Sequence, residues 1–152
     1  MHKSFSNIPG AACLAIVLTT LILSGCALFV SHYDAAAYQY FTSLKAYHIK
    51  FIDDYTVGEG KIWNEANVKS ACDTGELRFR EATEYAIGKK DASRVNAIGY
   101  LHNVFKLNCD LSLSKLKKLF GDAYATEQKN EVTKNYDWAI SGELSRVGAP
   151  TK

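Results

Sequence analysis

The sequence predicts an all-α fold, an antiparallel four-helix-bundle-like domain that follows an N-terminal export signal. Apolar residues recur at alternating steps of three and four along most of the chain, which is the spacing of one helix face. No stretch between turn residues alternates apolar and polar side chains, so β-strands have little support. The 152 residues are 47% hydrophobic and include only two prolines, which is typical of one ordered domain.

The first helix is expected at residues 33–55. Its apolar face consists of Ala37, Phe41, Leu44, His48, Phe51 and Tyr55. Asp34 is placed to cap this helix, because its carboxylate can accept hydrogen bonds from the unpaired backbone N–H groups of the first turn. Gly58 and Gly60 are expected to end the helix in a turn.

The second helical segment is expected at residues 61–87. Its apolar stripe consists of Val68, Cys72, Phe79, Ala82 and Ala86. Gly75 interrupts this stripe and costs up to about 1 kcal/mol relative to alanine in a helix, so we expect either one kinked helix or two short ones. Gly88, which two lysines follow, is typical of a helix C-terminus.

Two further helices are expected at residues 91–107 and 122–147. Asp91 caps the first of them, which is expected to end near Cys109 and to bury Val95, Ile98, Leu101, His102 and Phe105. Ser112 is expected to open a short separate stripe of Leu113, Leu116, Leu119 and Phe120. The last helix is expected to place the following residues mainly on one side: Tyr124, Val132, Tyr136, Ala139, Ile140, Leu144 and Val147.

The N-terminus has the layout of a secretory signal peptide, with Lys3 before an uncharged apolar segment and then small residues. The end of this segment resembles the lipobox of bacterial lipoproteins at four positions, Leu23, Ser24, Gly25 and Cys26. The resemblance implies a signal peptide at residues 1–25, a lipidated N-terminus and short tether at 26–32, a helical domain at 33–148 and a tail at 149–152.

The lipobox resemblance also implies how the chain is attached to a membrane. Cys26 would carry a diacylglyceryl group as a thioether, and its freed amine would accept a further acyl chain in species that perform that step. Two or three acyl chains anchor a protein stably. Ala27 is not the aspartate that retains many lipoproteins in the inner membrane, which favours the periplasmic face of the outer membrane. The alternative is an uncleaved transmembrane helix over residues 11–30.

Two cysteines, Cys72 and Cys109, remain in the expected exported domain once Cys13 is removed and Cys26 is acylated. An even pair in an oxidising compartment predicts a disulfide. Such a bond would contribute roughly 4 kcal/mol in the chain-entropy model. A reactive thiol or a metal pair is the alternative, although no C-x-x-C spacing is present and no histidine is near either cysteine in the sequence.

The charge pattern and the motifs exclude several classes of function. The formal charge of +2 arises from 18 basic and 16 acidic residues that are well mixed, so we expect no nucleic-acid partner. No phosphate loop, nucleophile elbow or zinc-protease motif occurs, so we expect no catalytic residue, no metal and no enzymatic activity. His48 and His102 both fall on expected apolar faces. The favoured interpretation is that each is a partly buried histidine bonded to a neighbour, because two isolated imidazoles lack the carboxylate partners of di-iron bundles. Facing histidines would allow an alternative function as a small-ligand-binding or haem-binding bundle.

Residues 33–47 resemble the start of the mature region in a group of small bacterial envelope proteins. The shared positions are Tyr33, Asp34, Tyr38, Ser43, Leu44 and Lys45. Residues 135–144 are similar to the closing helix of the same group. The resemblance implies an exported helical protein and transfers no catalytic residue.

Four tyrosines surround the first expected helix more widely than one buried stripe requires: Tyr33, Tyr38, Tyr40 and Tyr47. Tyrosine is favoured at binding surfaces because it combines apolar area with a hydroxyl group. These tyrosines are a candidate partner surface, and the alternative is wide burial within the bundle. We therefore expect a membrane-anchored, non-catalytic lipoprotein that acts through an envelope protein partner, as an assembly accessory or a structural component.

Overall fold

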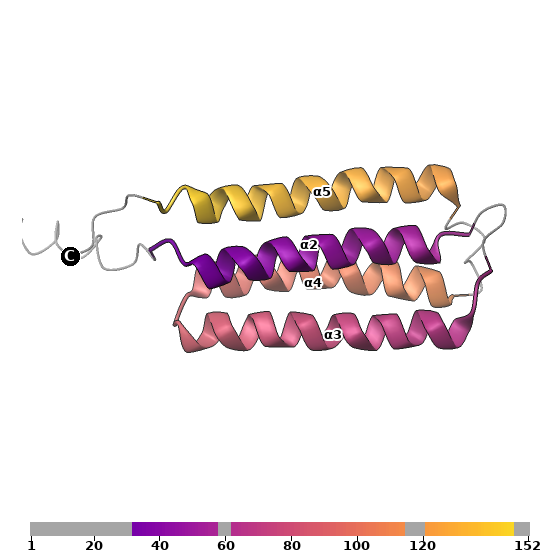
Figure 1. The fold of residues 1–152 in the computed structure, drawn as a ribbon, viewed down its shortest axis with the longest axis horizontal. Coiled ribbons are helices and arrows are strands. Elements are labelled where there is room, and N and C mark those ends of the chain that lie inside the picture. Colours follow the sequence, from indigo (N-terminus) through magenta and orange to yellow (C-terminus); the bar gives the residue numbers. More distant parts are fainter. Residues whose placement is uncertain (1–31, 58–61, 115–120, 148–152) are drawn as a thin grey trace, which may run out of the picture. The chain divides into compact units, whose positions relative to one another are not determined.

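The computed structural model describes residues 32–57, 62–114 and 121–147, and these form an all-α four-helix bundle, which confirms the predicted fold class (Figure 1). The helices are α2 (Ala35–Tyr55), α3 (Glu65–Gly88), α4 (Ala92–Leu113) and α5 (Asp122–Leu144). These described ranges contain no β-strand, and one isolated bridge joins Val57 to Gly121. The predictions for residues 1–31, and those for Leu116, Leu119 and Phe120, lie outside the described residues.

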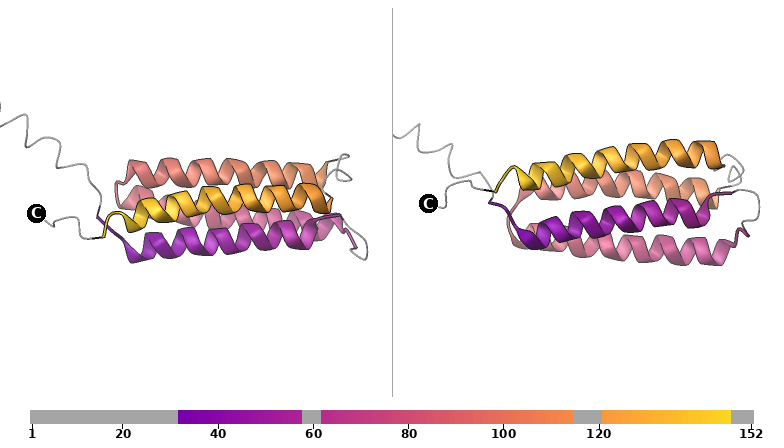
Figure 2. Two further views of the ribbon diagram at one scale, coloured as in Figure 1. Left: turned by 90° about the horizontal axis from the view of Figure 1, so that it is seen from above. Right: turned by 45° about the horizontal axis from the view of Figure 1, so that its top comes forward.

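The most extensive helix contacts in the bundle are those of α3 with α4 and of α2 with α5. Figure 2 shows the four helices from two further directions. The α2–α3 seam is looser, and α4 and α5 touch least among neighbouring helices. Phe105 of α4 lies at the centre of the core, with its ring centroid 5.1 Å from His48, 5.2 Å from Phe51 and 5.4 Å from Phe79. Aromatic side chains from three helices therefore meet around one ring.

The helix starts follow the predicted capping residues. The Asp34 carboxylate accepts hydrogen bonds from the backbone N–H groups of Ala36 and Ala37, and Asp91 accepts one from the N–H of Arg94. The α3 helix ends at Gly88, as predicted, although Gly88 itself is the last helical residue. The left-handed backbone conformation falls instead on Lys90, with φ of 54°.

The α3 helix is uninterrupted through Gly75, which settles the choice between one helix and two. Gly75 is buried, and a Cβ atom at this position would overlap the ring of Phe105 and lie 3.1 Å from Tyr47 Cε1. Glycine therefore allows the α3 backbone to approach the central ring closely. This close packing compensates for the weak helix propensity of glycine.

Three predicted boundaries and several predicted faces are wrong. The α5 helix ends at Leu144 and not at residue 147. The α4 helix does not end near Cys109 but continues to Leu113, because Asn108, Cys109 and Ser112 extend its buried stripe. Ser112 therefore lies in the last turn of α4 and opens no new element. On the predicted buried side of the last segment, three residues are exposed: Tyr124 (37%), Leu144 (47%) and Val147 (61%).

The predicted cysteine pair is brought together between α3 and α4. Cys72 and Cys109 are buried, their sulfur atoms lie at disulfide distance, and their Cα atoms are 5.9 Å apart. The pair closes a loop with a sequence separation of 37 residues and connects the first half of α3 to the end of α4.

The close approach at Gly75 can be tested by adding a single methyl group. We expect Gly75→Ala to lower the free energy of unfolding by about 1–3 kcal/mol, because the added Cβ atom would overlap the Phe105 ring, which is fully buried. Gly99→Ala is the matched control, since nothing lies within 4 Å of its Cβ position and it should stabilise α4 by up to about 1 kcal/mol. Urea unfolding measures both changes, and equal stabilisation by both would contradict the packing argument.

Candidate functional site

A network of charged side chains closes the end of the bundle at which α2 and α4 begin and α3 and α5 end. We call it the end network, and it consists of Asp34, Asp91, Arg94, Glu143 and Arg146. Arg94, Asp91 and Glu143 are each no more than 5% exposed. Buried charges are stable only when they are paired and hydrogen-bonded, so the contacts of this network decide its role.

The central contact of the end network is a two-pronged ion pair between α4 and α5. Arg94 Nε donates to Glu143 Oε2 at 2.9 Å, and Arg94 Nη2 donates to Oε1 at 2.7 Å. Arg94 Nη1 lies 2.8 Å from Asp91 Oδ2, and Arg146 donates to the same oxygen at 2.7 Å. Two cations and two anions therefore balance in this part of the network.

The end network also holds the segment that leads into α2. Arg94 Nη2 donates to the backbone carbonyl oxygen of His32 at 2.7 Å, and the backbone N–H of Asp34 donates to Glu143 Oε1 at 2.7 Å. The Tyr85 hydroxyl donates to the Asp34 carboxylate at 2.7 Å. The chain just before α2 is thus attached to α3, α4 and α5 by polar contacts.

Hydrogen bonds favour the charged forms of two residues of the end network. Burial by itself raises the pKa of Asp34, but the hydrogen bond from Tyr85 and those from the N–H groups of Ala37 and Ala36 outweigh it and lower that pKa below its usual value. Burial likewise lowers the pKa of Arg94, and the hydrogen bonds and charge of Glu143 more than reverse this. The partners of Asp34 and Arg94 therefore more than compensate for the effect of burial on these two pKa values.

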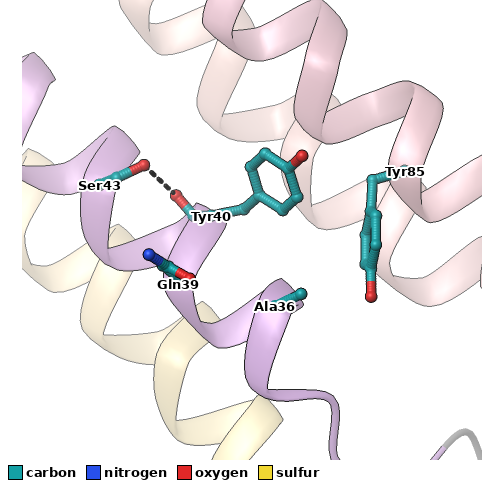
Figure 3. Close-up of a pocket in the computed structure, with 5 residues that line it drawn as sticks. All are labelled: Ala36, Gln39, Tyr40, Ser43 and Tyr85. Carbon is teal, nitrogen blue, oxygen red and sulfur yellow. Dashed lines mark hydrogen bonds between the residues drawn. The ribbon is translucent and has the colours of Figure 1, made fainter.

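A second candidate site is a shallow groove along the α2–α3 seam. It consists of two adjoining hollows of about 330 and 390 Å³ that share Tyr40 and Ser43. The other residues that line it are Ala36, Gln39, Leu44, Thr74, Leu77, Arg78, Glu81 and Tyr85. Figure 3 shows Tyr40 pointing from α2 towards Tyr85 of α3, and the two ring centroids are 5.2 Å apart.

The four tyrosines that were predicted to form a partner surface lie in different environments. Tyr40 lines the groove, and Tyr47 lies half-buried near it, where its hydroxyl donates to the Ala71 carbonyl at 2.5 Å. Arg78 lies 4.6 Å from the centroid of the Tyr47 ring. Tyr33 and Tyr38 pair with each other, with ring centroids 6.5 Å apart. Tyr40 and Tyr47 thus contact α3, whereas the other two form a separate pair.

His48 lies in the core of the bundle and is fully buried. Its Nε2 atom is 2.9 Å from Asn108 Nδ2, and its Nδ1 atom is 3.5 Å from the Tyr136 hydroxyl. Burial lowers the pKa of His48 to about 3. The amide of Asn108 donates to Nε2 in this arrangement, so Nδ1 carries the proton of the neutral ring. Both ring nitrogens therefore have partners from the protein.

His102 is partly buried and bonded to a neighbour, Glu76, as the favoured interpretation predicts, and it does not share the polar partners of His48. Its side chain is 27% exposed, its Nε2 atom is 2.9 Å from Glu76 Oε2, and its ring stacks on Phe79 with centroids 4.8 Å apart. Among the residues that the structure describes, no group of three or more histidine, cysteine or acidic side chains could hold a metal ion.

Two further results bear on function. Within the described ranges, no helix has a stretch long and apolar enough to cross a bilayer. Comparison with protein-family models, with curated proteins and with solved structures finds no match to this chain.

The end network is a site that the sequence pattern did not predict. Glu143 continues the three- and four-residue spacing of the buried residues Val132, Tyr136 and Ala139. A charged residue at a position of this apolar stripe was the one sign in the sequence that Glu143 is buried. Arg94 follows the cap residue Asp91 by three positions, which is a second, weaker signal. Neither signal names the partner helix, because the pairing of α4 with α5 arises only in the folded bundle.

The end network can be tested by removal of its central carboxylate. We expect Glu143→Ala to lower the free energy of unfolding by about 3–5 kcal/mol, because Arg94 would remain buried with its main partner lost. The amide hydrogen of Asp34 should also exchange faster, since it loses its acceptor. Asp137→Ala is the control: it breaks the more exposed pair with Lys45 and should cost at most about 1 kcal/mol. Equal effects of the two variants would contradict this role.

The buried His48 predicts a specific pH dependence. Between the folded pKa of about 3 and the ordinary value of 6.5, the unfolded chain binds a proton that the folded protein does not. The free energy of unfolding should therefore fall as the pH falls from 6.5 towards 3, by about 1.4 kcal/mol per pH unit for this group. In urea unfolding between pH 7 and pH 4, His48→Gln should show a shallower fall than the wild type. Parallel curves would contradict a neutral buried ring.

Proposed function

We propose that this chain is a membrane-anchored, non-catalytic bacterial lipoprotein that acts through protein contacts in the cell envelope, as an assembly accessory or a structural component. The observation that carries the proposal is the lipobox-like sequence at Leu23–Cys26, followed after a short tether by a bundle. Cys26 would carry the diacylglyceryl group and an N-linked acyl chain, and the outer membrane is the favoured location.

The end network supports the anchored arrangement. If the domain is tethered, any force transmitted by the tether acts on the residues at which the tether joins the bundle. Here those residues are His32 and Asp34, and their backbone groups bond to Arg94 and Glu143, which are buried. The entry point of the tether is thus joined to the two helices most distant from it in sequence.

The α2–α3 groove is the surface we propose for the protein partner. It is open to solvent, it combines tyrosine rings with the charged side chains of Arg78 and Glu81, and Leu77 beside it is 53% exposed. Interfaces are enriched in tyrosine and arginine, whose side chains combine apolar area with hydrogen-bonding groups. Tyr40 would be the aromatic contact at the point where the two hollows join.

The alternative function, a haem-binding or small-ligand-binding bundle, gains no support from the geometry of its two histidines. Both ring nitrogens of His48 have protein partners, and His102 contacts Glu76. An absorbance spectrum of the purified protein distinguishes the two functions. A Soret band that is lost in the His48→Ala/His102→Ala variant would favour haem binding.

The anchor is tested by mass spectrometry and fractionation of the full chain expressed in a bacterial host. The mature protein should lack residues 1–25 and gain the mass of two or three acyl chains, because Cys26 is the predicted lipid attachment site. Cys26→Ser should abolish the acyl mass. Cys13→Ser is the matched control and should leave the acyl mass unchanged. A wild-type chain that is found in the membrane without acyl mass and with residues 1–25 still present would favour the transmembrane alternative.

The groove is tested by crosslinking and pull-down from native membranes. We expect Gln39→Arg/Ser43→Arg to lose the crosslinked neighbour, because both exposed side chains line the groove and arginine would fill it. Asn130→Arg/Ser141→Arg on α5 is the matched control, with the same kinds of residue replaced at exposed positions. Recovery of the same neighbours by both variants would refute docking through this groove.

A further inference from the structure

The end of the bundle that carries the end network also has exposed apolar residues and lysines. Ile87 is 51% exposed, Val147 is 61% exposed and Tyr33 is 38% exposed. Lys89 and Lys90 lie in the turn between α3 and α4, and both are exposed. Apolar and aromatic side chains next to lysines are the composition that favours the interface of a bilayer.

Contacts of the end network place these residues at one end of the molecule. Lys89 Nζ lies 3.5 Å from the Asp34 carboxylate, next to Tyr33 in sequence. Arg146, which precedes Val147, bonds to Asp91, which follows Lys90. Figure 1 shows the start of α2, the α3–α4 turn and the end of α5 at the same end of the bundle.

The charged groups at this end differ in their partners. Asp34, Asp91 and Glu143 each pair with a cation of the protein. Lys90 has no ion pair with another residue that the structure describes, and half of the Lys89 side chain is exposed. Glu84, one turn before the end of α3, is exposed as well, so this end offers two exposed lysines to an anionic headgroup rather than a net positive charge.

The length of the tether restricts what this end can reach. If Cys26 is acylated, His32 lies six positions after the lipid-bearing residue, and this stretch of chain spans about 20 Å when fully extended. The 24 residues of α3 make the bundle about 36 Å long. The tether thus keeps this end near the bilayer, whereas Leu113 at the end of α4 lies at the opposite end of the bundle.

We propose that the end of the bundle formed by Tyr33, Ile87, Lys89, Lys90 and Val147 rests on the headgroup region of a bilayer that contains anionic lipids. This inference depends on the proposed function, because it needs the acylated Cys26. The apolar side chains of Ile87 and Val147 enter the interface, and the two ammonium groups pair with lipid phosphates. The long axis of the bundle then points away from the membrane, and the α2–α3 groove faces sideways.

The test uses the full acylated chain in phosphatidylethanolamine vesicles with or without phosphatidylglycerol, plus a lipid brominated near its headgroup as a quencher. Ile87→Trp and Leu113→Trp place matched reporters at opposite ends, over the same background from Trp63 and Trp138. We expect the bromines to quench the reporter at 87 and not the one at 113. Quenching at 87 should be stronger with phosphatidylglycerol.

The charge contribution is tested with Lys89→Gln/Lys90→Gln in the Ile87→Trp chain. The double replacement should lower the quenching in anionic vesicles about twofold or more, whereas Lys106→Gln/Lys134→Gln, at exposed sites elsewhere, should leave it unchanged. Circular dichroism of each variant checks that the bundle is still folded, and a folded Lys90→Gln variant replaces any double variant that is not.

Each other outcome overturns the inference. Equal quenching at 87 and 113 means that the bundle lies on its side, and no quenching at either position means that it stands off the bilayer. If quenching at position 87 changes neither with phosphatidylglycerol nor with the lysine replacements, the contact with anionic headgroups is refuted. Absence of acyl mass on the purified chain overturns the proposed function as well, whereas an acylated chain that is not quenched at 87 overturns this inference alone.

Discussion

The buried ion pair between Arg94 and Glu143 is the interaction on which the end of this bundle depends. Removing two charges from water is costly, and the cost is offset here only because Asp91, Arg146 and two backbone groups complete the hydrogen bonding. The same contacts fix the direction in which the chain enters α2. A single set of polar contacts therefore connects all four helices and determines where an N-terminal tether would leave the fold.

The core of the bundle depends on apolar packing and not on ion pairs, because its side chains pack around one aromatic ring. Phe105 touches rings from α2 and α3, and Gly75 lets the α3 backbone approach it. The buried polar ring of His48 has partners within the same core, because it lies between Asn108 and Tyr136. Close packing of this kind gives the bundle one well-defined arrangement of side chains, which a core of interchangeable aliphatic residues would specify less strictly.

Two kinds of exposed side chain lie on different parts of the bundle surface. The tyrosines of α2 that contact α3 lie at or beside the groove, which exposes aromatic and charged side chains. The exposed residues Ile87, Lys89 and Lys90 lie instead at the end of the bundle where α2 begins. The proposed protein contact and the proposed membrane contact are compatible, because they use different surfaces of the bundle.

The sequence by itself determined the all-α class, the caps at Asp34 and Asp91, the residues of the α2 core face from Ala37 to Phe51 and the cysteine pair, because these depend on local spacing and on counting cysteines. Tertiary structure alone decided the continuity of α3 through Gly75, the length of α4, and the burial of Glu143 in place of Leu144. The physical reason is that each of these outcomes depends on a partner from another helix: the Phe105 ring for Gly75, the adjoining core for the last turn of α4, and the Arg94 guanidinium for Glu143. Periodicity along one helix contains no information about which charge faces it across the bundle.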